Sequence, residues 1–455
     1  MAAKRLKKRK HSNPAPEPKP DAAGIDVGST EMWAAVGPDR DENPTRCYAS
    51  FTENLHELAD WLQQCGIRTV AMESTGVYWI PLFQILESRG FEVCLVNAHY
   101  PKHAPGRKTD VDDCQWLQYL HSVGLLTASF RPPQAICTVR AVLRHRDSLT
   151  ALAASHVQRM QKSLDQMNLH LHHVISDITG LTGLAILDAI LAGEREPQKL
   201  ARLRDRRIKA SEETIMKSLV GDYRSEHLFT LRQALATYRH YQIQISECDQ
   251  EIKALMAGLD SQYQPAPPVA GPPVKRGRGR PKGSHTSDAL LQRELHRIFG
   301  TDLTLIPGID VTTVQTILSE VGPNLSAFRS GPAFASWLRL CPDNKISGGK
   351  VLATKTRPTK NRLTQALRMA AQSLVHSLSA VGDYHRRLRA RLGPPHAVTA
   401  TAHRLARIIY HLISTRQSYN DSIFTQLEKQ HQQRAENRLK AHARARGFQL
   451  VPLEA

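Results

Sequence analysis

The chain has 455 residues, 41% of them hydrophobic, which predicts a globular protein of two or three domains. Lys and Arg outnumber Asp and Glu by 61 to 42, and the net charge of +19 favours a polyanionic partner, because cations on phosphates release counterions. No apolar run approaches the ~18 residues of a membrane span, and the basic N-terminus lacks the apolar stretch of a signal peptide, so we expect a cytoplasmic protein with no membrane partner. The seven Cys form no Cys-x-x-Cys pair, which argues against structural zinc and a disulfide framework.

A basic segment precedes an α/β pattern. Six Lys and Arg lie between Lys4 and Lys10 and four prolines follow, which predicts a disordered basic arm over residues 1–22. Between 23 and 135, short apolar runs alternate with helical patterns, so we expect an α/β domain with a mixed sheet. The expected strands are 24–36 (with a sharp turn back at Gly28), 46–51, 69–73 and 91–96, and the expected helices are 54–64, 78–88 and 110–123.

Four carboxylates stand out in this domain. Asp26 lies inside the first apolar run, and Glu73 ends the run at 69–73. Asp110 and Asp113 are three residues apart in a helical pattern, so both face one side of the helix. Asp112 lies between them, points elsewhere, and is expected to be solvated. Two acids on strands and a pair on a helix can therefore converge on one site.

Such a set suits metal-dependent chemistry on a phosphodiester. Carboxylate oxygens are the hard ligands that Mg²⁺ prefers, and two ions about 4 Å apart can stabilise the attacking and leaving oxygens of a phosphoryl displacement. Any single acid is more simply an exposed charge or a helix cap. The set of four predicts Mg²⁺ ligands with a catalytic role: Asp26, Glu73, Asp110 and Asp113.

The pattern changes at about residue 136. Apolar residues between Val157 and Val174, and again between Leu231 and Leu259, are spaced three and four apart. This spacing predicts two long helices with coiled-coil seams within residues 136–261. The seams could form a dimerisation arm or pack against each other as a helical hairpin within one chain, and the spacing does not choose between the two.

Residues 262–290 lose this periodicity and become rich in Pro, Gly and Arg, which predicts a linker. Its Arg-Gly-Arg-Pro core resembles an AT-hook, whose arginines enter a narrow A·T minor groove. On that interpretation the nucleic-acid contacts are Arg276, Arg278 and Arg280. A solvated basic linker is the equal alternative.

The remaining chain is predicted to be mainly helical, with one domain over residues 291–392 and a basic helical tail over 393–455. A Pro-Gly-Ile turn at 307–309 resembles a helix-hairpin-helix, whose amides contact phosphates. Ser347 stands in a polar loop before two glycines, as an exposed nucleophile would, although from spacing alone an ordinary turn is the simpler interpretation. Further expected nucleic-acid contacts are Lys108, Lys350, Arg386 and Arg387.

Two motif blocks resemble insertion-sequence transposases of the "110" family. Asp26, Glu73 and the run at 106–113 resemble the Asp-Glu-Asp-Asp (DEDD) tetrad of a RuvC-like (RNase H-like) domain in that family. The block at 306–350 is similar to the family's C-terminal transposase domain, especially in its "1111" subgroup. The blocks stand in the family's order and cover most of residues 23–410.

The resemblance implies a transposase and DNA recombinase in which the tetrad binds Mg²⁺ and Ser347 attacks DNA, forming a phosphoserine intermediate. It also implies a noncoding bridge RNA whose loops pair with donor and target double-stranded DNA. The implied assembly is a homodimer that joins into a tetramer, the serine of one subunit completing the carboxylate site of another. A bacterial, nucleoid-associated protein is expected. The basic arm and the insert at 262–290 depart from the compact family pattern.

Three other functions fit parts of the pattern. A metal-dependent RuvC-like nuclease acting on Holliday junctions would use water and would not need Ser347. The segment Asp26 to Thr30 also resembles the first phosphate loop of actin-like sugar kinases, but no second phosphate loop or adenosine motif follows. A non-enzymatic architectural protein would bind nucleic acid without Mg²⁺ and would leave the acid tetrad without a role.

Overall fold

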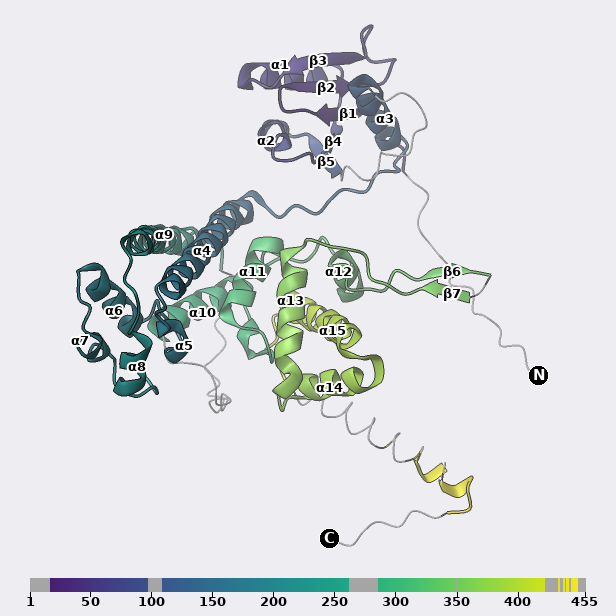
Figure 1. Ribbon diagram of the computed structural model, residues 1–455. Helices are drawn as coiled ribbons and strands as arrows, with labels where there is room; N and C mark the ends of the chain where they lie inside the picture. The colour runs from purple at the N-terminus through teal and green to yellow at the C-terminus, as the bar shows by residue number, and fades with distance from the viewer. Residues whose placement is uncertain are drawn as a thin grey trace. The chain divides into compact units, whose positions relative to one another are not determined.

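The computed structural model describes residues 17–96, 109–261, 285–348 and 350–421, together with scattered residues between 433 and 448. It consists of two units, Met1–Arg131 and Pro132–Ala455, which are treated separately below (Figure 1). The start of the basic arm, most of the predicted linker and four predicted nucleic-acid contacts lie outside the described residues; these contacts are Lys108, Arg276, Arg278 and Arg280.

The N-terminal unit contains the predicted mixed sheet. Its strands follow the order β3-β2-β1-β4-β5. The first three strands along the chain pair antiparallel, whereas β4 and β5 extend the sheet in parallel with β1. The strands are β1 (Ala22–Val27), β2 (Glu31–Ala35), β3 (Thr45–Ala49), β4 (Thr69–Glu73) and β5 (Glu92–Val96). The sharp turn back after the first strand is confirmed, with the Gly28 amide donating to the Glu31 carbonyl at 2.9 Å.

The two faces of the sheet carry different helices. Ile25 and Met72 point to the face where the main core also contains residues of α1 (Thr52–Gln64) and α2 (Trp79–Ser88). Successive side chains on a strand alternate between faces. The neighbours of Ile25 and Met72 therefore point to the opposite face, where α3 (Asp110–Ser122) packs against β1, β2 and β4.

Helix α3 approaches β1 closely at Gly24. A Cβ atom at Gly24 would lie 2.2 Å from the backbone nitrogen of Gln118 and 2.4 Å from the carbonyl oxygen of Cys114. The contact is reinforced by two hydrogen bonds, one from the Gln118 side chain to the Ala22 carbonyl (3.3 Å) and one between His121 and Thr69 (2.8 Å). Only glycine at position 24 lets the two backbones meet at this distance.

In the C-terminal unit, α4 (Gln134–Gln166) and α9 (Ser225–Ala257) run antiparallel, side by side (Figure 1). Near one end the hydroxyls of Ser163 and Thr230 lie 3.0 Å apart, and toward the other Arg146 donates to Asp249 at 3.2 Å. Apolar residues of both helices are buried between them. The seams thus pack as a hairpin within one chain, which is one of the two arrangements that the spacing allowed. A dimerisation role stays a prediction.

The predicted continuous helix through Val174 is wrong at its end. Helix α4 ends at Gln166, and Asn168 adopts φ 55° before α5 (Leu171–Val174) begins. Asn tolerates this left-handed conformation better than most residues, so the apolar spacing continues although the helix does not. Three helices then pack with the end of α4, α5 and the start of α9 around a second apolar core; they are α6 (Leu181–Leu191), α7 (Pro197–Ala201) and α8 (Glu212–Ser218).

The C-terminal helices form a packed body rather than a domain followed by a tail. Helix α15 contacts α12, α13 and α14 and buries Leu405 and Ile409 among others, so the predicted boundary at 392 falls between packed helices. The elements are α10 (His285–Phe299), the 3-10 helix Leu303–Leu305, α11 (Val311–Val321), α12 (Gly331–Trp337), α13 (Arg362–Ser373), the 3-10 helix Leu374–His376, α14 (Ala380–Leu392) and α15 (Pro394–Thr415).

The Pro-Gly-Ile turn lies against α13. Gly308 has φ 85°, and a Cβ there would lie 2.8 Å from the Ala370 carbonyl oxygen. Ile306 and Ile309 on either side are buried. The turn therefore serves packing, and the phosphate contacts of a helix-hairpin-helix stay a prediction.

A partly buried ion pair joins α4 to α11. Glu320 is 5% exposed and accepts hydrogen bonds from Arg144 at 2.9 and 3.0 Å. Arg140, one turn earlier on α4, donates to the carbonyls of Ser319 and Glu320 at 2.7 and 3.0 Å. These bonds satisfy the last carbonyls of α11, which lack partners within their own helix.

A two-stranded hairpin, β6 (Lys345–Ser347) and β7 (Lys350–Ala353), extends from the helical body (Figure 1). Ser347 pairs with Lys350 across the turn, where Gly348 adopts φ 54°. Ile346 and Leu352 on the two strands are 62% and 69% exposed.

None of the helices within the described residues has the length and apolar character needed to cross a bilayer.

We expect Gly24→Ala to destabilise the N-terminal unit by about 1–3 kcal/mol, because the new methyl group must push α3 away from β1. Urea unfolding followed by tryptophan fluorescence measures this change, since Trp33, Trp61, Trp79 and Trp116 all lie in that unit. Gly37→Ala is the matched control, because its Cβ would meet side chains rather than backbone, and its one close contact, 2.6 Å to Oδ1 of Asp39, is to an exposed side chain that can move away. Equal stability of the two variants would contradict the close contact.

Candidate active site

The four predicted acids come from three elements that meet on one side of the sheet. The parallel register pairs Ile25 with Met72, so the next residues along the two strands are Asp26 and Glu73. Both point to the face covered by α3. Asp110 and Asp113 lie in the first turn of that helix, which begins after Thr109. The predicted arrangement of strand acids beside a helical pair is present in the structure.

Electrostatics shows that the four side chains lie near one another. The pKa of Asp26 is raised from its ordinary 3.8 to about 6, by burial first and then by the charges of Glu73, Asp110 and Asp113 in that order. A single hydrogen bond from the Val27 amide acts in the opposite direction. Neighbouring negative charges disfavour ionisation of a carboxyl group, and a cation among them removes that penalty. The donor chemistry therefore fits a hard divalent ion.

The spacing of the ligand atoms is wider than in a closed metal site. Among the described residues, the groups that bring three potential ligand atoms within 4.8 Å of one another do not include any three of the tetrad. Holding one ion with three of these acids would require their side chains to rotate inward. The backbone thus places the four acids on one face of the sheet, and changes of side-chain rotamer are needed to bring their oxygens onto one ion.

Asp112 behaves as the sequence predicted. Its carboxylate accepts a hydrogen bond from the Thr109 hydroxyl at 2.7 Å, and its amide donates back to that hydroxyl at 3.2 Å. Asp112 is exposed and takes part in capping α3. Asp112 thus stabilises the helix that carries the two metal-ligand candidates Asp110 and Asp113.

On the strand side, the Glu73 carboxylate accepts a hydrogen bond from Thr75 at 3.0 Å.

Two further residues line this face and were not singled out in the sequence. Cys114 is fully buried on α3, and burial, with a contribution from Asp26, raises the pKa of its thiol to about 12, so it stays uncharged. Trp33 pairs with Asp26 across β1 and β2, and its indole nitrogen is buried without a hydrogen-bond partner in the described part of the chain. A strand register, which the sequence does not display, is needed to place Trp33 beside Asp26.

The C-terminal candidates occupy different surroundings. Ser347 and Lys350 are both exposed on the β6–β7 hairpin. Arg386 is held by its own region, donating to the Val375 carbonyl at 3.2 Å and pairing with Asp383. Arg387 is exposed on α14. Ser347 therefore has the accessibility that a nucleophile needs, whereas Arg386 has a structural task.

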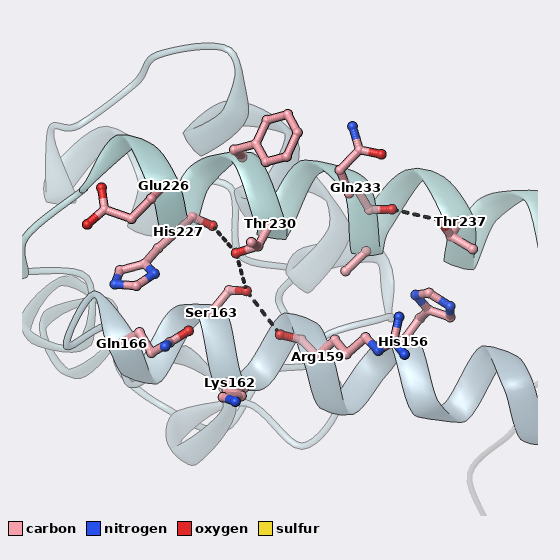
Figure 2. A pocket seen from close by; sticks show the side chains of 12 residues that line it. His156, Arg159, Lys162, Ser163, Gln166, Glu226, His227, Thr230, Gln233 and Thr237 are labelled. Carbon is pink, nitrogen blue, oxygen red and sulfur yellow. Dashed lines mark hydrogen bonds between the residues drawn. The ribbon is translucent and has the colours of Figure 1, made fainter.

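A basic groove between α4 and α9 was also missed by the sequence analysis. Figure 2 shows that Ser163 bridges the two helices, with its hydroxyl near the Arg159 carbonyl and Thr230. The titratable side chains that line the groove are two cations, Arg159 and Lys162, two histidines, His156 and His227, and one acid, Glu226. The signal was present as a run of polar residues three apart on α4, beside its apolar seam. Such side chains suit contacts with a phosphate backbone.

Comparison with known families agrees with this architecture. A model for DEDD transposases of the IS110 type, described as "Transposase", matches residues 23–169, and a model described as "Transposase IS116/IS110/IS902 family" matches residues 301–386. The chain belongs to this IS110 family of transposases. A Sinorhizobium fredii protein named "Putative transposase y4pF/y4sB" is 30% identical over 126 residues, which cover 26% of this chain and about a third (32%) of that relative.

The raised pKa of Asp26 predicts a stability effect that depends on pH. The pKa of the Asp26 carboxyl group is higher in the folded state than in the unfolded state. Its contribution to the free energy of unfolding is therefore fully present below pH 3.8 and is lost as the pH rises through about 6. We expect Asp26→Asn to raise the free energy of unfolding of the N-terminal unit by about 1–2 kcal/mol at pH 7.5 in chelator, a figure reduced for solvent screening.

Below pH 4 the same substitution should leave stability unchanged, because the wild-type carboxyl group is then protonated in both states. Urea unfolding by tryptophan fluorescence at the two pH values checks this. Added Mg²⁺ should shrink the difference at pH 7.5 by neutralising the wild-type cluster. A gain that is the same at both pH values would show that charge is not its cause.

Proposed function

We propose that this protein is a transposase that mobilises its insertion sequence by Mg²⁺-dependent cleavage and exchange of DNA strands. The observation that carries the proposal is the convergence of Asp26, Glu73, Asp110 and Asp113 on one face of the sheet, with Asp26 destabilised as an anion by burial and by the other three acids. Structural ion pairs bring opposite charges together, whereas this cluster brings like charges together. Such an arrangement is typical of sites that work with a bound cation.

The tetrad would hold Mg²⁺, which polarises the phosphodiester and stabilises the developing charge of the displacement. The residues of this chain supply the placement. Asp26 and Glu73 are fixed by adjacent strands, and Asp110 and Asp113 by the first turn of α3. The face between them is lined by an uncharged thiol at Cys114, so the negative charge is confined to the carboxylates.

Ser347 is the proposed nucleophile. Its Oγ gives up its proton and forms a bond to phosphorus while the bond from phosphorus to one deoxyribose oxygen breaks, and that oxygen takes up a proton and leaves as a hydroxyl, so no net proton is gained or lost. The phosphoserine bond preserves the energy of the phosphodiester, so a different strand end can attack it and release the serine. The exposure of Ser347 beside a Gly turn and Lys350 supports this role.

The proposed partners are donor and target double-stranded DNA and a noncoding bridge RNA that selects both by base pairing. The net charge of +19 and the basic groove between α4 and α9 support polyanion binding. In this division of labour the RNA reads sequence and the protein reads backbone and shape. The proposed assembly is a homodimer that joins into a tetramer, with serine and carboxylates contributed by different subunits.

The metal-ligand assignment is tested by neighbouring aspartates on α3. We expect Asp113→Asn to slow Mg²⁺-dependent strand cleavage at least roughly 10- to 100-fold, because a ligand carboxylate is lost. Asp112→Asn is the matched control on the same turn, since Asp112 contacts Thr109 instead. Cleavage of labelled junction DNA against Mg²⁺ concentration measures both. Equal losses in the two variants would count against the tetrad.

The nucleophile is tested by trapping it. Incubation with Mg²⁺, labelled junction DNA and RNA transcribed from the flanking element should give a protein–DNA adduct that survives denaturation and maps to Ser347. Ser347→Ala should abolish the adduct, whereas Ser326→Ala, at another exposed serine of the same unit, should keep it. Cut DNA without an adduct would point to a nuclease that uses water, and an adduct formed equally without RNA would remove the guide from the proposal.

A further inference from the structure

A second cluster of metal-ligand side chains lies in the C-terminal unit, apart from the tetrad. Asp165 is in the last turn of α4, and His172 and His173 form the middle of α5. One ligand atom from each lies within 4.8 Å of the other two. Among the described residues, this is the group of three His, Cys, Asp or Glu side chains whose ligand atoms all lie within 4.8 Å of one another. This cluster contains no cysteine. The argument from the cysteine pattern against structural zinc therefore does not apply to it.

The distances are close to those of a bound transition metal. Bonds of about 2.0–2.1 Å place neighbouring ligand atoms on a tetrahedral zinc ion about 3.3 Å apart. Asp165 Oδ1 and His172 Nε2 already lie 3.4 Å apart. The rings of His172 and His173 have centroids 4.2 Å apart. Small side-chain rotations at the exposed Asp165 and His173 would bring all three onto one ion.

His172 is prepared for ligation. Its side chain is 13% exposed, and its Nδ1 atom is buried without a hydrogen-bond partner in the described part of the chain. The other ring nitrogen, Nε2, faces the Asp165 carboxylate at 3.4 Å, so an ion shared with Asp165 would bind Nε2 while Nδ1 carries the proton of the neutral ring.

The backbone between the ligands is held in place from outside. The His170 amide donates to the Ser218 carbonyl at 2.8 Å, and the Met167 carbonyl accepts from the Asp222 amide at 2.9 Å. Met167, Leu169 and Leu171 are buried in the core between α4 and the small helices. Ligands whose backbone is fixed before binding lose little entropy when the ion arrives.

We propose that Asp165, His172 and His173 form a site for a late first-row divalent cation, zinc foremost, with water completing the coordination. Two imidazoles and a carboxylate are the donors that such ions select, whereas Mg²⁺ prefers oxygen alone. The ion would tie the last turn of α4 to α5 across the break at 167–170. The site is independent of the proposed strand-exchange chemistry.

The test uses the full-length protein, stripped with chelator, incubated with Zn²⁺ and freed of excess by gel filtration. We expect wild type to retain about one zinc ion per chain more than His173→Ala or Asp165→Asn, with zinc affinity at least about tenfold weaker in each variant. His240→Ala, an exposed imidazole on α9, should match wild type. Far-UV circular dichroism should be the same for all four proteins.

The same difference between wild type and His173→Ala should persist in an Asp26→Asn background, which separates this site from the tetrad. His173 is exposed, so its loss leaves the core intact and the comparison decides the question even if His172→Ala fails to fold. Equal zinc content in wild type, His173→Ala and Asp165→Asn, or no zinc retained by wild type, would overturn the proposal.

Discussion

The contact between the backbones of α3 and β1 at Gly24 governs the N-terminal unit. Because no side chain separates them, the first turn of α3 is brought over the ends of β1 and β4, where Asp26 and Glu73 stand. Any larger residue at position 24 would lift Asp110 and Asp113 away from their partners. The hydrogen bonds of Gln118 and His121 to the neighbouring strands fix the same helix at two further points. One missing Cβ atom thus sets the geometry of four carboxylates.

The placement of the four carboxylates destabilises the N-terminal unit electrostatically. Four acids on one face repel one another, and burial of Asp26 adds to the penalty. The cost is met by packing elsewhere in the unit, chiefly the apolar core between the other face of the sheet and α1 and α2. Because the acids lie on regular elements rather than loops, they cannot move apart to relieve their repulsion. A bound cation can relieve it, and this adds to the affinity of the site for the cation.

Local patterns in the sequence were sufficient for the elements but not for their junctions. The strands, the helix from Asp110 and the tetrad were predicted because periodicity and charge are local properties. The break at Asn168 was missed because the apolar spacing runs through it, and the backbone there is set by hydrogen bonds to residues 218–222. The position of Trp33 depends on strand register, and the groove needs the pairing of α4 with α9, of which the polar run on α4 displays one half only. Asp165, His172 and His173 are close in sequence, but they converge through the backbone break at Asn168, which their spacing does not display.

The hairpin that carries Ser347 has no core of its own. Two short strands with Ile346 and Leu352 exposed are marginal in water, so the hairpin depends on the bonds at its base, where the Asp343 amide donates to the Lys355 carbonyl at 2.9 Å. A segment anchored at one end can change its direction at little cost in free energy. If Ser347 is the nucleophile proposed above, a surface that covers the exposed pair would hold it in one orientation, and the rate of attack would follow how often that surface is present.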